Sequence, residues 1–195
     1  LGKEQVYKTV DPDNTDISPH TQRIYLAGGE PFMIKSFSKM LESLENKDCE
    51  IVINTNATIL TKHMMTALEP FTNVCFVLSI DGTGDVIERI RTLCSWDMIQ
   101  SNIQILRDKL SPNFMVNTVI QKDNLDNIPE LAEWIDDQKI RLWHTTILTD
   151  PSKYHYSHYI GKLNWSNDLW DRQCVSRNIQ VKNSLGFVYK ELTPA

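Results

Sequence analysis

The alternation of apolar, β-rich runs with helical stretches is the feature that most limits how this chain can fold. Five runs of this kind occupy residues 24–27, 51–54, 74–80, 114–120 and 140–148. Most of them are almost continuously apolar, which is typical of strands covered on both faces of a parallel sheet. The pattern therefore predicts an α/β protein with a parallel sheet.

Helical periodicity fills the gaps between these runs. Apolar residues recur at the spacing of one helix face in residues 37–44, 64–68, 96–110 and 127–135. In the last stretch, Asn127 and Glu130 have the spacing of a capping box. Repeated strand–helix units predict right-handed crossovers. An open doubly wound sheet and part of a TIM-like barrel both satisfy this pattern.

Small and polar residues directly follow three of the predicted strands. Gly28-Gly29-Glu30-Pro31 follows the first, NTNAT at 54–58 the second, and SIDGTGD at 79–85 the third. Ligands bind at the carboxyl ends of parallel strands, so we expect these segments to line one concavity. A single Gly-Gly or Asp-Gly turn is more often only structural, but three such ends in succession favour a ligand site.

The side chains at these ends indicate what kind of ligand would bind. Glycine allows backbone to approach a ligand closely, and Glu30 can accept a hydrogen bond from an ammonium or hydroxyl group. Asn56, Ser79 and Asp81 can bind hydroxyl groups or an amide-like edge. Together they suit a ligand with an amino acid part and a ribose.

The net charge and the spacing of the cysteines exclude several classes of protein. A net charge of -5 and a pI of about 5.5 argue against a nucleic-acid or anionic-membrane surface. No apolar stretch approaches the roughly 18 residues of a membrane helix. The four cysteines, Cys49, Cys75, Cys94 and Cys174, lack metal-site spacing. We expect a buried thiol at Cys75 and a reducing compartment, the cytoplasm.

The segments YLAGGEPF, TNAT and LSIDGTG, in this order, resemble the radical S-adenosylmethionine (SAM) superfamily, particularly members with a SPASM or Twitch extension. The resemblance runs from about Arg23 to Leu148. It implies a partial TIM-like (β/α)6 barrel with outer helices, here missing its first strand, and a strand order that follows the chain. Residues 1–22 would be a polar N-terminal segment, 23–149 the partial barrel, and 150–195 an aromatic, irregular extension that begins a Twitch- or SPASM-like region.

The resemblance also implies roles for residues of the first turn. In the family, the GGEP turn receives the amino group of the methionine part of SAM. Gly28, Gly29 and Glu30 match that turn, and Pro31 would stiffen it.

Four more residues match positions further along the family's site. Ser79 and Asp81 match positions near the ribose and methionine parts, and Asn56 lines the same wall. Arg91, in ERIRTL, matches an arginine that often holds the methionine carboxylate. A solvated surface arginine is the equally weighted alternative.

The CxxxCxxC motif that holds the family's [4Fe-4S] cluster is absent, and residues 1–20 contain no cysteine. No cluster is therefore expected in this chain. The intact GGEP and a first residue other than Met favour a fragment over a degenerate homologue. The intact parent would reductively cleave SAM to a 5′-deoxyadenosyl radical that abstracts hydrogen, with a peptide or protein substrate suggested by analogy. A catalytically inactive protein-interaction module is the alternative.

Three further expectations concern histidines and the sheet edge. His144 is expected to be a satisfied core histidine, the alternative being a side chain that faces the barrel interior. HYSH at 155–158 is expected to be a surface loop rather than a metal site. A missing first strand would leave strand 24–27 with an open edge. EQVYKTV at 4–10 would cover that edge or pair with a second molecule, which predicts a dimer.

Overall fold

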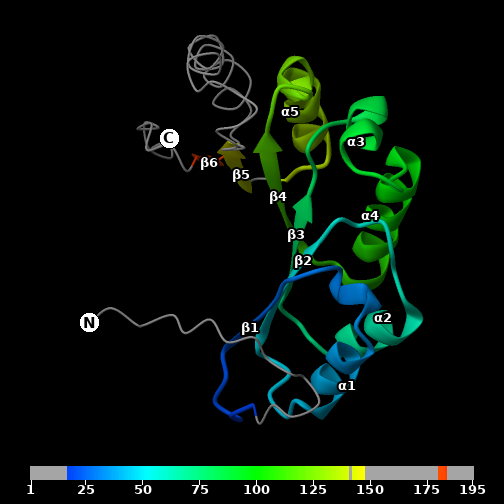
Figure 1. Ribbon diagram of the computed structural model, residues 1–195. Coiled ribbons are helices and arrows are strands. Elements are labelled where there is room, and N and C mark those ends of the chain that lie inside the picture. Colours follow the sequence, from blue (N-terminus) through cyan, green and yellow to red (C-terminus); the bar gives the residue numbers. More distant parts are fainter. Residues whose placement is uncertain (1–16, 141, 148–179, 184–195) are drawn as a thin grey trace.

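A computed structural model describes residues 17–140, 142–147 and 180–183 of the chain. These residues form a curved sheet whose helices lie on one side (Figure 1). The sheet has six strands in the order β1-β2-β3-β4-β5-β6, and every neighbouring pair is parallel. The predicted parallel α/β fold and the predicted strand order are confirmed.

From β1 to β5 the strands and helices alternate, apart from two consecutive helices, α3 and α4. The strands are β1 (Arg23–Leu26), β2 (Glu50–Thr55), β3 (Val74–Ser79), β4 (Asn113–Ile120), β5 (Leu142–Ile147) and β6 (Gln180–Asn183). The helices are α1 (Lys35–Ser43), α2 (Lys62–Leu68), α3 (Gly84–Ile90), α4 (Trp96–Leu110) and α5 (Ile128–Asp137), with short 3-10 turns η2 (Pro31–Met33) and η3 (Leu125–Asn127).

One α-helix and one strand were not predicted from the sequence. Helix α3 has only 7 residues and follows directly on the glycine-rich third strand end, so its short apolar stripe was hidden in a loop-like segment. Strand β6 reads QVKN, which is mostly polar, yet it pairs with β5. The sheet therefore continues into residues that were expected to form an irregular extension.

Alternation along the strands gives the sheet two different faces. Ile53, Phe76, Val116 and Trp143 lie on the helix side, and each is fully buried, at 0% exposure. Side chains at the alternate positions, such as that of Ser79, lie on the opposite face, because successive residues of a strand point to opposite sides. We call this second face the inner face of the sheet.

The predicted capping box at the start of α5 is wrong. Asn127 precedes the helix, but its side chain makes no capping bond. Its Oδ1 instead accepts from the backbone N–H of Thr83 at 2.7 Å, and its Nδ2 donates to Thr83 Oγ1 and to Glu130 Oε2. Thr83 lies just before α3, so Asn127 connects the start of α5 to the start of α3 instead of capping its own helix.

No helix in the described ranges is long and apolar enough to cross a membrane.

The edge formed by β1 leads to a testable expectation. β1 ends the strand order and pairs with β2 alone among the described strands, while the segment expected to cover it, residues 4–10, lies outside the described residues. We expect the chain to dimerise through this edge. Light scattering at several protein concentrations measures the average mass. A mass equal to that of the monomer at every concentration would contradict the expectation.

Candidate functional site at the strand ends

Glu30 connects the ends of β1 and β2. Its Oε1 accepts a hydrogen bond from Thr55 Oγ1 at 2.7 Å, and its Oε2 accepts one from the backbone N–H of Asn56 at 3.0 Å. It also caps the following 3-10 turn, because Oε1 accepts from Phe32 N–H at 3.4 Å. The carboxylate is therefore held in one place at the rim, and its remaining lone pairs suit an ammonium or hydroxyl group.

The two glycines before Glu30 make this turn possible. Gly28 and Gly29 have φ values of +96° and +56°, a region that L side chains rarely adopt. A Cβ atom built at either position would meet no atom within 4 Å. The glycines therefore serve the turn and border open space. Pro31 is buried as the first residue of η2, a position that suits its fixed φ.

Polar side chains also connect β2 to β3. Ser79 Oγ donates to Asn54 Oδ1 at 3.1 Å on the inner face. Asn56 folds back on its own turn, where its Oδ1 accepts from the N–H and the hydroxyl of Thr58. The next residue, Ala57, is fully buried with φ of +57°. The second strand end is thus a rigid turn that holds the backbone N–H of Asn56 against Glu30.

Asp81 and Arg91 form an ion pair. Arg91 Nε and Nη2 lie 2.9 Å and 2.7 Å from Asp81 Oδ2. Asp81 is only 4% exposed, and its Oδ1 accepts from the backbone N–H of Val119. Both of its oxygens are therefore engaged, so Asp81 holds Arg91. The Arg91 side chain is 30% exposed, so it is partly buried beside Asp81.

A pocket of about 410 Å³ brings two of the predicted residues together. Its lining consists of Asn56, Thr58, Ile59, Arg91, Thr92, Leu93, Cys94 and Met98. Polar groups line one part of this pocket and apolar side chains the rest, a composition usual for small-molecule sites. Glu30 reaches the pocket's wall through its bond to Asn56. Ser79 and the glycines do not line it.

Two residues that support the site were missed from the sequence. Thr55 is 2% exposed and anchors Glu30. Asn124 is fully buried, and its Nδ2 donates to the backbone carbonyls of Asp81 and Val119. Thr55 lies in the second of the three polar strand ends, so its position in the sequence could have indicated a role at the site. Asn124 lies in a polar loop, QKDN, where nothing local indicates burial.

His144 is hydrogen-bonded, as expected, but it does not lie in the core. It is half-buried on β5, between the fully buried Trp143 and Thr145. Its Nδ1 lies 2.8 Å from Asn117 Oδ1 on β4. Strand alternation therefore places His144 on the inner face, which was the alternative expectation.

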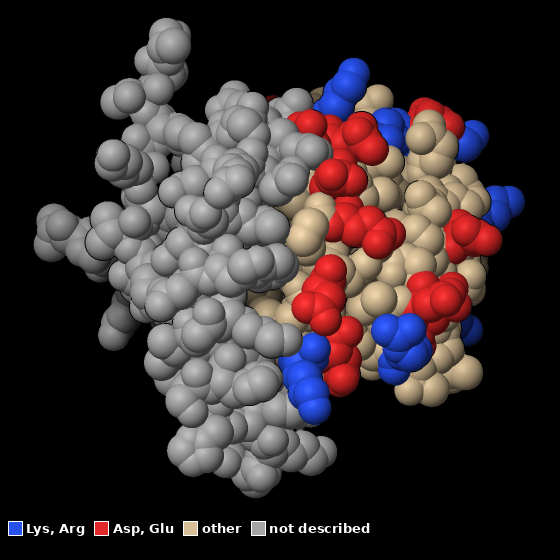
Figure 2. All heavy atoms as spheres, turned by 90° about the horizontal axis from the view of Figure 1, so that it is seen from above, with Lys and Arg blue, Asp and Glu red and all other residues tan. Residues whose placement is uncertain are grey.

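Acidic side chains are prominent at the end of the molecule toward which β3 and β4 point. Seen from that end, Asp and Glu form a band across the described surface, and the basic side chains lie mainly toward its margins (Figure 2). An acidic field of this kind favours cationic ligands over anionic ones.

A comparison with models of protein families identifies the family of this chain. The family model of the radical SAM superfamily matches residues 8–135, which is more than half of the chain. This protein belongs to the radical SAM superfamily. Comparison with curated proteins found no match.

Solved structures with a similar fold include the following three. SuiB of Streptococcus suis, with bound S-adenosylmethionine, is 18% identical with a TM-score of 0.61, over 83% of this chain and 37% of SuiB. The protein anSMEcpe, with bound AdoMet and a Cp18Cys peptide, is 16% identical with a TM-score of 0.64, over 87% of this chain and 52% of anSMEcpe. A domain of a pyruvate-formate lyase-activating enzyme from Bacteroides vulgatus is 12% identical with a TM-score of 0.55, over 83% of this chain and 98% of the domain.

At these identities the likeness concerns the fold alone, and it agrees with the predicted partial TIM-like barrel. The chain spans well under two thirds of the SuiB and anSMEcpe chains.

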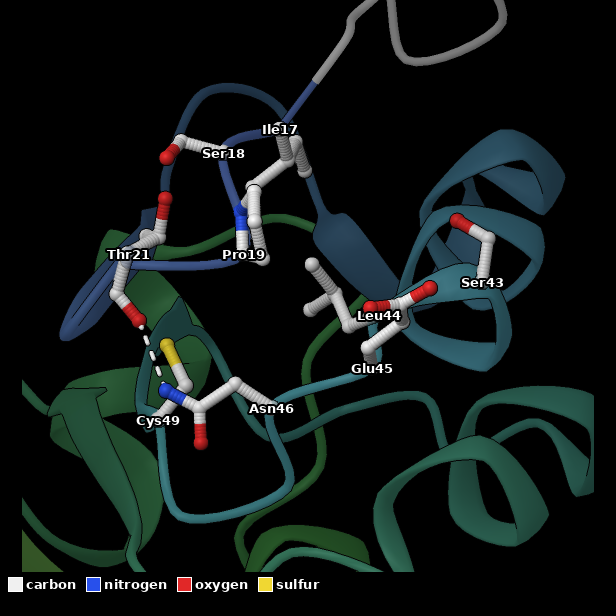
Figure 3. A pocket seen from close by; sticks show the side chains of 9 residues that line it. All are labelled: Ile17, Ser18, Pro19, Thr21, Ser43, Leu44, Glu45, Asn46 and Cys49. Carbon is white, nitrogen blue, oxygen red and sulfur yellow. Dashed lines mark hydrogen bonds between the residues drawn. The ribbon is translucent and has the colours of Figure 1, made fainter.

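The described cysteines do not fit the iron–sulfur cluster of the family. Cys49 lies before β2 and lines a pocket of about 370 Å³ together with residues that precede β1 (Figure 3). Cys94 lines the rim pocket with Asn56, which follows the other end of β2. A six-residue strand separates these two ends by about 20 Å. One cluster therefore cannot take both thiols as ligands.

Burial raises the pKa values of Cys49, Cys75 and Cys94 above the ordinary thiol value. The three side chains are therefore protonated thiols at neutral pH. Cys75 is buried, as predicted.

We therefore expect the purified chain to remain colourless after anaerobic reconstitution with iron and sulfide. Iron analysis and the visible thiolate-to-iron absorption measure the outcome. Stoichiometric iron with stable absorption, retained after desalting, would contradict this expectation.

Proposed function

We propose that this chain is the S-adenosylmethionine-binding part of a radical SAM enzyme that acts on a peptide or protein. When the enzyme carries its [4Fe-4S] cluster, the chemistry supplied is reductive cleavage of SAM to a 5′-deoxyadenosyl radical that abstracts hydrogen from the substrate. The structure of this chain supports a role in binding and orienting SAM. The cluster ligands would have to come from outside the described residues.

The observation that carries the proposal is the way Glu30 is held between β1 and β2. Its carboxylate is fixed by Thr55 and by the backbone of Asn56, beside the open space that Gly28 and Gly29 border. A fixed carboxylate at such a place suits the ammonium group of the methionine part. A preorganised acceptor binds more tightly because little side-chain freedom is lost on binding.

Arg91 would bind the opposite charge. Its Nε and Nη2 contact Asp81, while the structure gives its Nη1 no partner in the described ranges. Nη1 can therefore donate to the methionine carboxylate, with Asp81 orienting the guanidinium. Asn56 and Ser79 would serve the ribose hydroxyls. SAM carries a sulfonium and an ammonium against one carboxylate, so the acidic surface at this end favours its approach.

The inactive interaction module remains a second candidate because the printed sequence contains no CxxxCxxC motif. In the fold, the three described cysteines lie at separated places. The two functions differ in one simple measurement, because only the first requires SAM to bind at the strand ends. A module that has lost its cofactor site would show no saturable SAM binding.

Ligand-observed NMR with SAM tests the proposal and suits the weak binding expected without a cluster. For Arg91→Gln we expect about 10-fold weaker binding or more, since a charge-assisted hydrogen bond contributes about 1.5–3 kcal/mol. Glutamine retains a hydrogen bond to Asp81, which limits damage to the fold. Arg89→Gln, on an exposed position of α3, is the matched control. Equal affinities of all three proteins would remove Arg91 from the site, and no binding by the parent chain would overturn the proposal.

A further inference from the structure

A row of polar side chains crosses the inner face at one level of the sheet. Ser79 on β3 is in register with Asn117 on β4, which is in register with His144 on β5. All three are half-buried. The neighbours of His144 in the strand are 0% and 1% exposed on the helix side, so His144 and its row belong to the inner face.

The side chains of this row take part in two hydrogen-bonded pairs. Ser79 donates to Asn54, and His144 Nδ1 lies 2.8 Å from Asn117 Oδ1. An amide oxygen only accepts, so Nδ1 of His144 is the donor and carries the proton. In a neutral imidazole the second nitrogen, Nε2, is then an acceptor.

The Asn117–His144 pair therefore offers two different groups. One is Nε2 of His144, an acceptor. The other is Nδ2 of Asn117, a donor to which the structure assigns no partner among the described residues. A donor and an acceptor on neighbouring strands are complementary to the N–H and C=O of one residue in an extended peptide, because these two groups point to the same side of the chain. Neither Asn nor His carries a permanent charge, so the pair is not built to select a carboxylate or phosphate, for which charge-assisted bonds are stronger.

We propose that Asn117 and His144 form a binding site for the backbone of a peptide substrate, at the C=O and N–H of one residue. Asn117 Nδ2 donates to the substrate carbonyl oxygen, and His144 Nε2 accepts from the substrate N–H. Asn54 and Ser79 extend the polar row toward the candidate SAM site. The inference rests on the proposed function, since it takes the inner face of the barrel as the place where a peptide substrate lies.

The tautomer of His144 is the first test, and it needs no variant. Long-range ¹⁵N–¹H spectra of the full chain, with ¹⁵N-labelled histidine, report which ring nitrogen carries the proton. We expect Nδ1–H at His144. Asn117→Ala should release this preference, whereas the exposed His63 on α2 serves as an internal reference. An Nε2–H ring at His144 in the parent chain would overturn the proposal.

The second test is a titration with two dipeptide analogues. N-acetylglycine N-methylamide carries peptide N–H groups, whereas N-acetylsarcosine N,N-dimethylamide keeps the carbonyl groups and has none. We expect the first to shift the His144 Nε2 signal saturably and the second to bind about 10-fold more weakly. Asn117→Ala should weaken the first about 10-fold, and His63→Gln should change nothing. Equal binding of both analogues, or no shift at His144, would overturn the proposal.

SAM binding, measured separately, distinguishes the two proposals. A chain that binds the amide analogue but not SAM keeps the peptide site and loses the cofactor role. A chain that binds SAM but not the amide analogue does the reverse. Circular dichroism of each variant confirms that a lost signal does not come from unfolding.

Discussion

Asn124→Ala is expected to lower the free energy of unfolding by about 3 kcal/mol or more. The side chain is fully buried, and it makes three bonds to backbone groups. Its Nδ2 donates to the carbonyls of Asp81 and Val119 at 2.7 and 2.8 Å, and its Oδ1 accepts from Gln121 N–H at 2.8 Å. Alanine would leave these groups unpaired, and each buried group left so costs about 1–3 kcal/mol.

Urea denaturation of the full chain measures this change. The midpoint should fall without a change in the slope, because the surface exposed on unfolding stays the same. Asn113→Ala is the matched control. Asn113 is exposed at the start of β4, so its loss should stay within about 0.5 kcal/mol. Equal losses for both variants would show that the Asn124 bonds do not stabilise the fold.

Glu30→Gln should weaken SAM binding about 10- to 100-fold. The charge that would pair with the ammonium group is lost, and charge-assisted hydrogen bonds contribute about 1.5–3 kcal/mol. The substitution also affects the contact between the ends of β1 and β2, because Thr55 and Asn56 both donate to this side chain. Glutamine can keep both contacts only if its oxygen accepts from Asn56 N–H and its NH2 donates to Thr55, whose hydroxyl must then turn from donor to acceptor.

Titration with SAM, followed by ligand-observed NMR, measures the affinity. Glu42→Gln on the exposed side of α1 is the control for a lost carboxylate, and its affinity should equal that of the parent. The amide signal of Asn56 in the SAM-free variants reports whether the turn has moved. Unchanged SAM affinity in Glu30→Gln would remove Glu30 from the site.

The spacing of apolar residues along short stretches of the sequence determined the fold class. The continuous apolar runs predicted five parallel strands, and all five are present within one or two residues of the expected ends. These patterns are local and depend only on burial, which repeats every second residue in a strand and about every 3.6 in a helix. Helix α3 and strand β6 were not predicted, because a short or polar segment contains too few apolar residues to show a clear periodicity.

The strand ends were also recognised from the sequence, because small and polar residues stand out directly after apolar runs. The sequence placed Glu30, Asn56, Ser79 and Asp81 at one rim, and the parallel sheet does bring the ends of their strands to one edge. Parallel pairing makes this inference general: once the strands are known to be parallel, their carboxyl ends meet.

Only the tertiary structure decided what each polar side chain contacts. Thr55 bonds to Glu30 across 25 positions, and Asn127 bonds to Thr83 across 44. Asp81 is buried against Arg91 and Val119, although its sequence setting indicates only a turn. Hydrogen-bond partners are chosen by proximity in the folded chain. An asparagine whose sequence position suits a helix cap can therefore bind a distant loop instead. The residues next to it in the sequence do not indicate which partner it has.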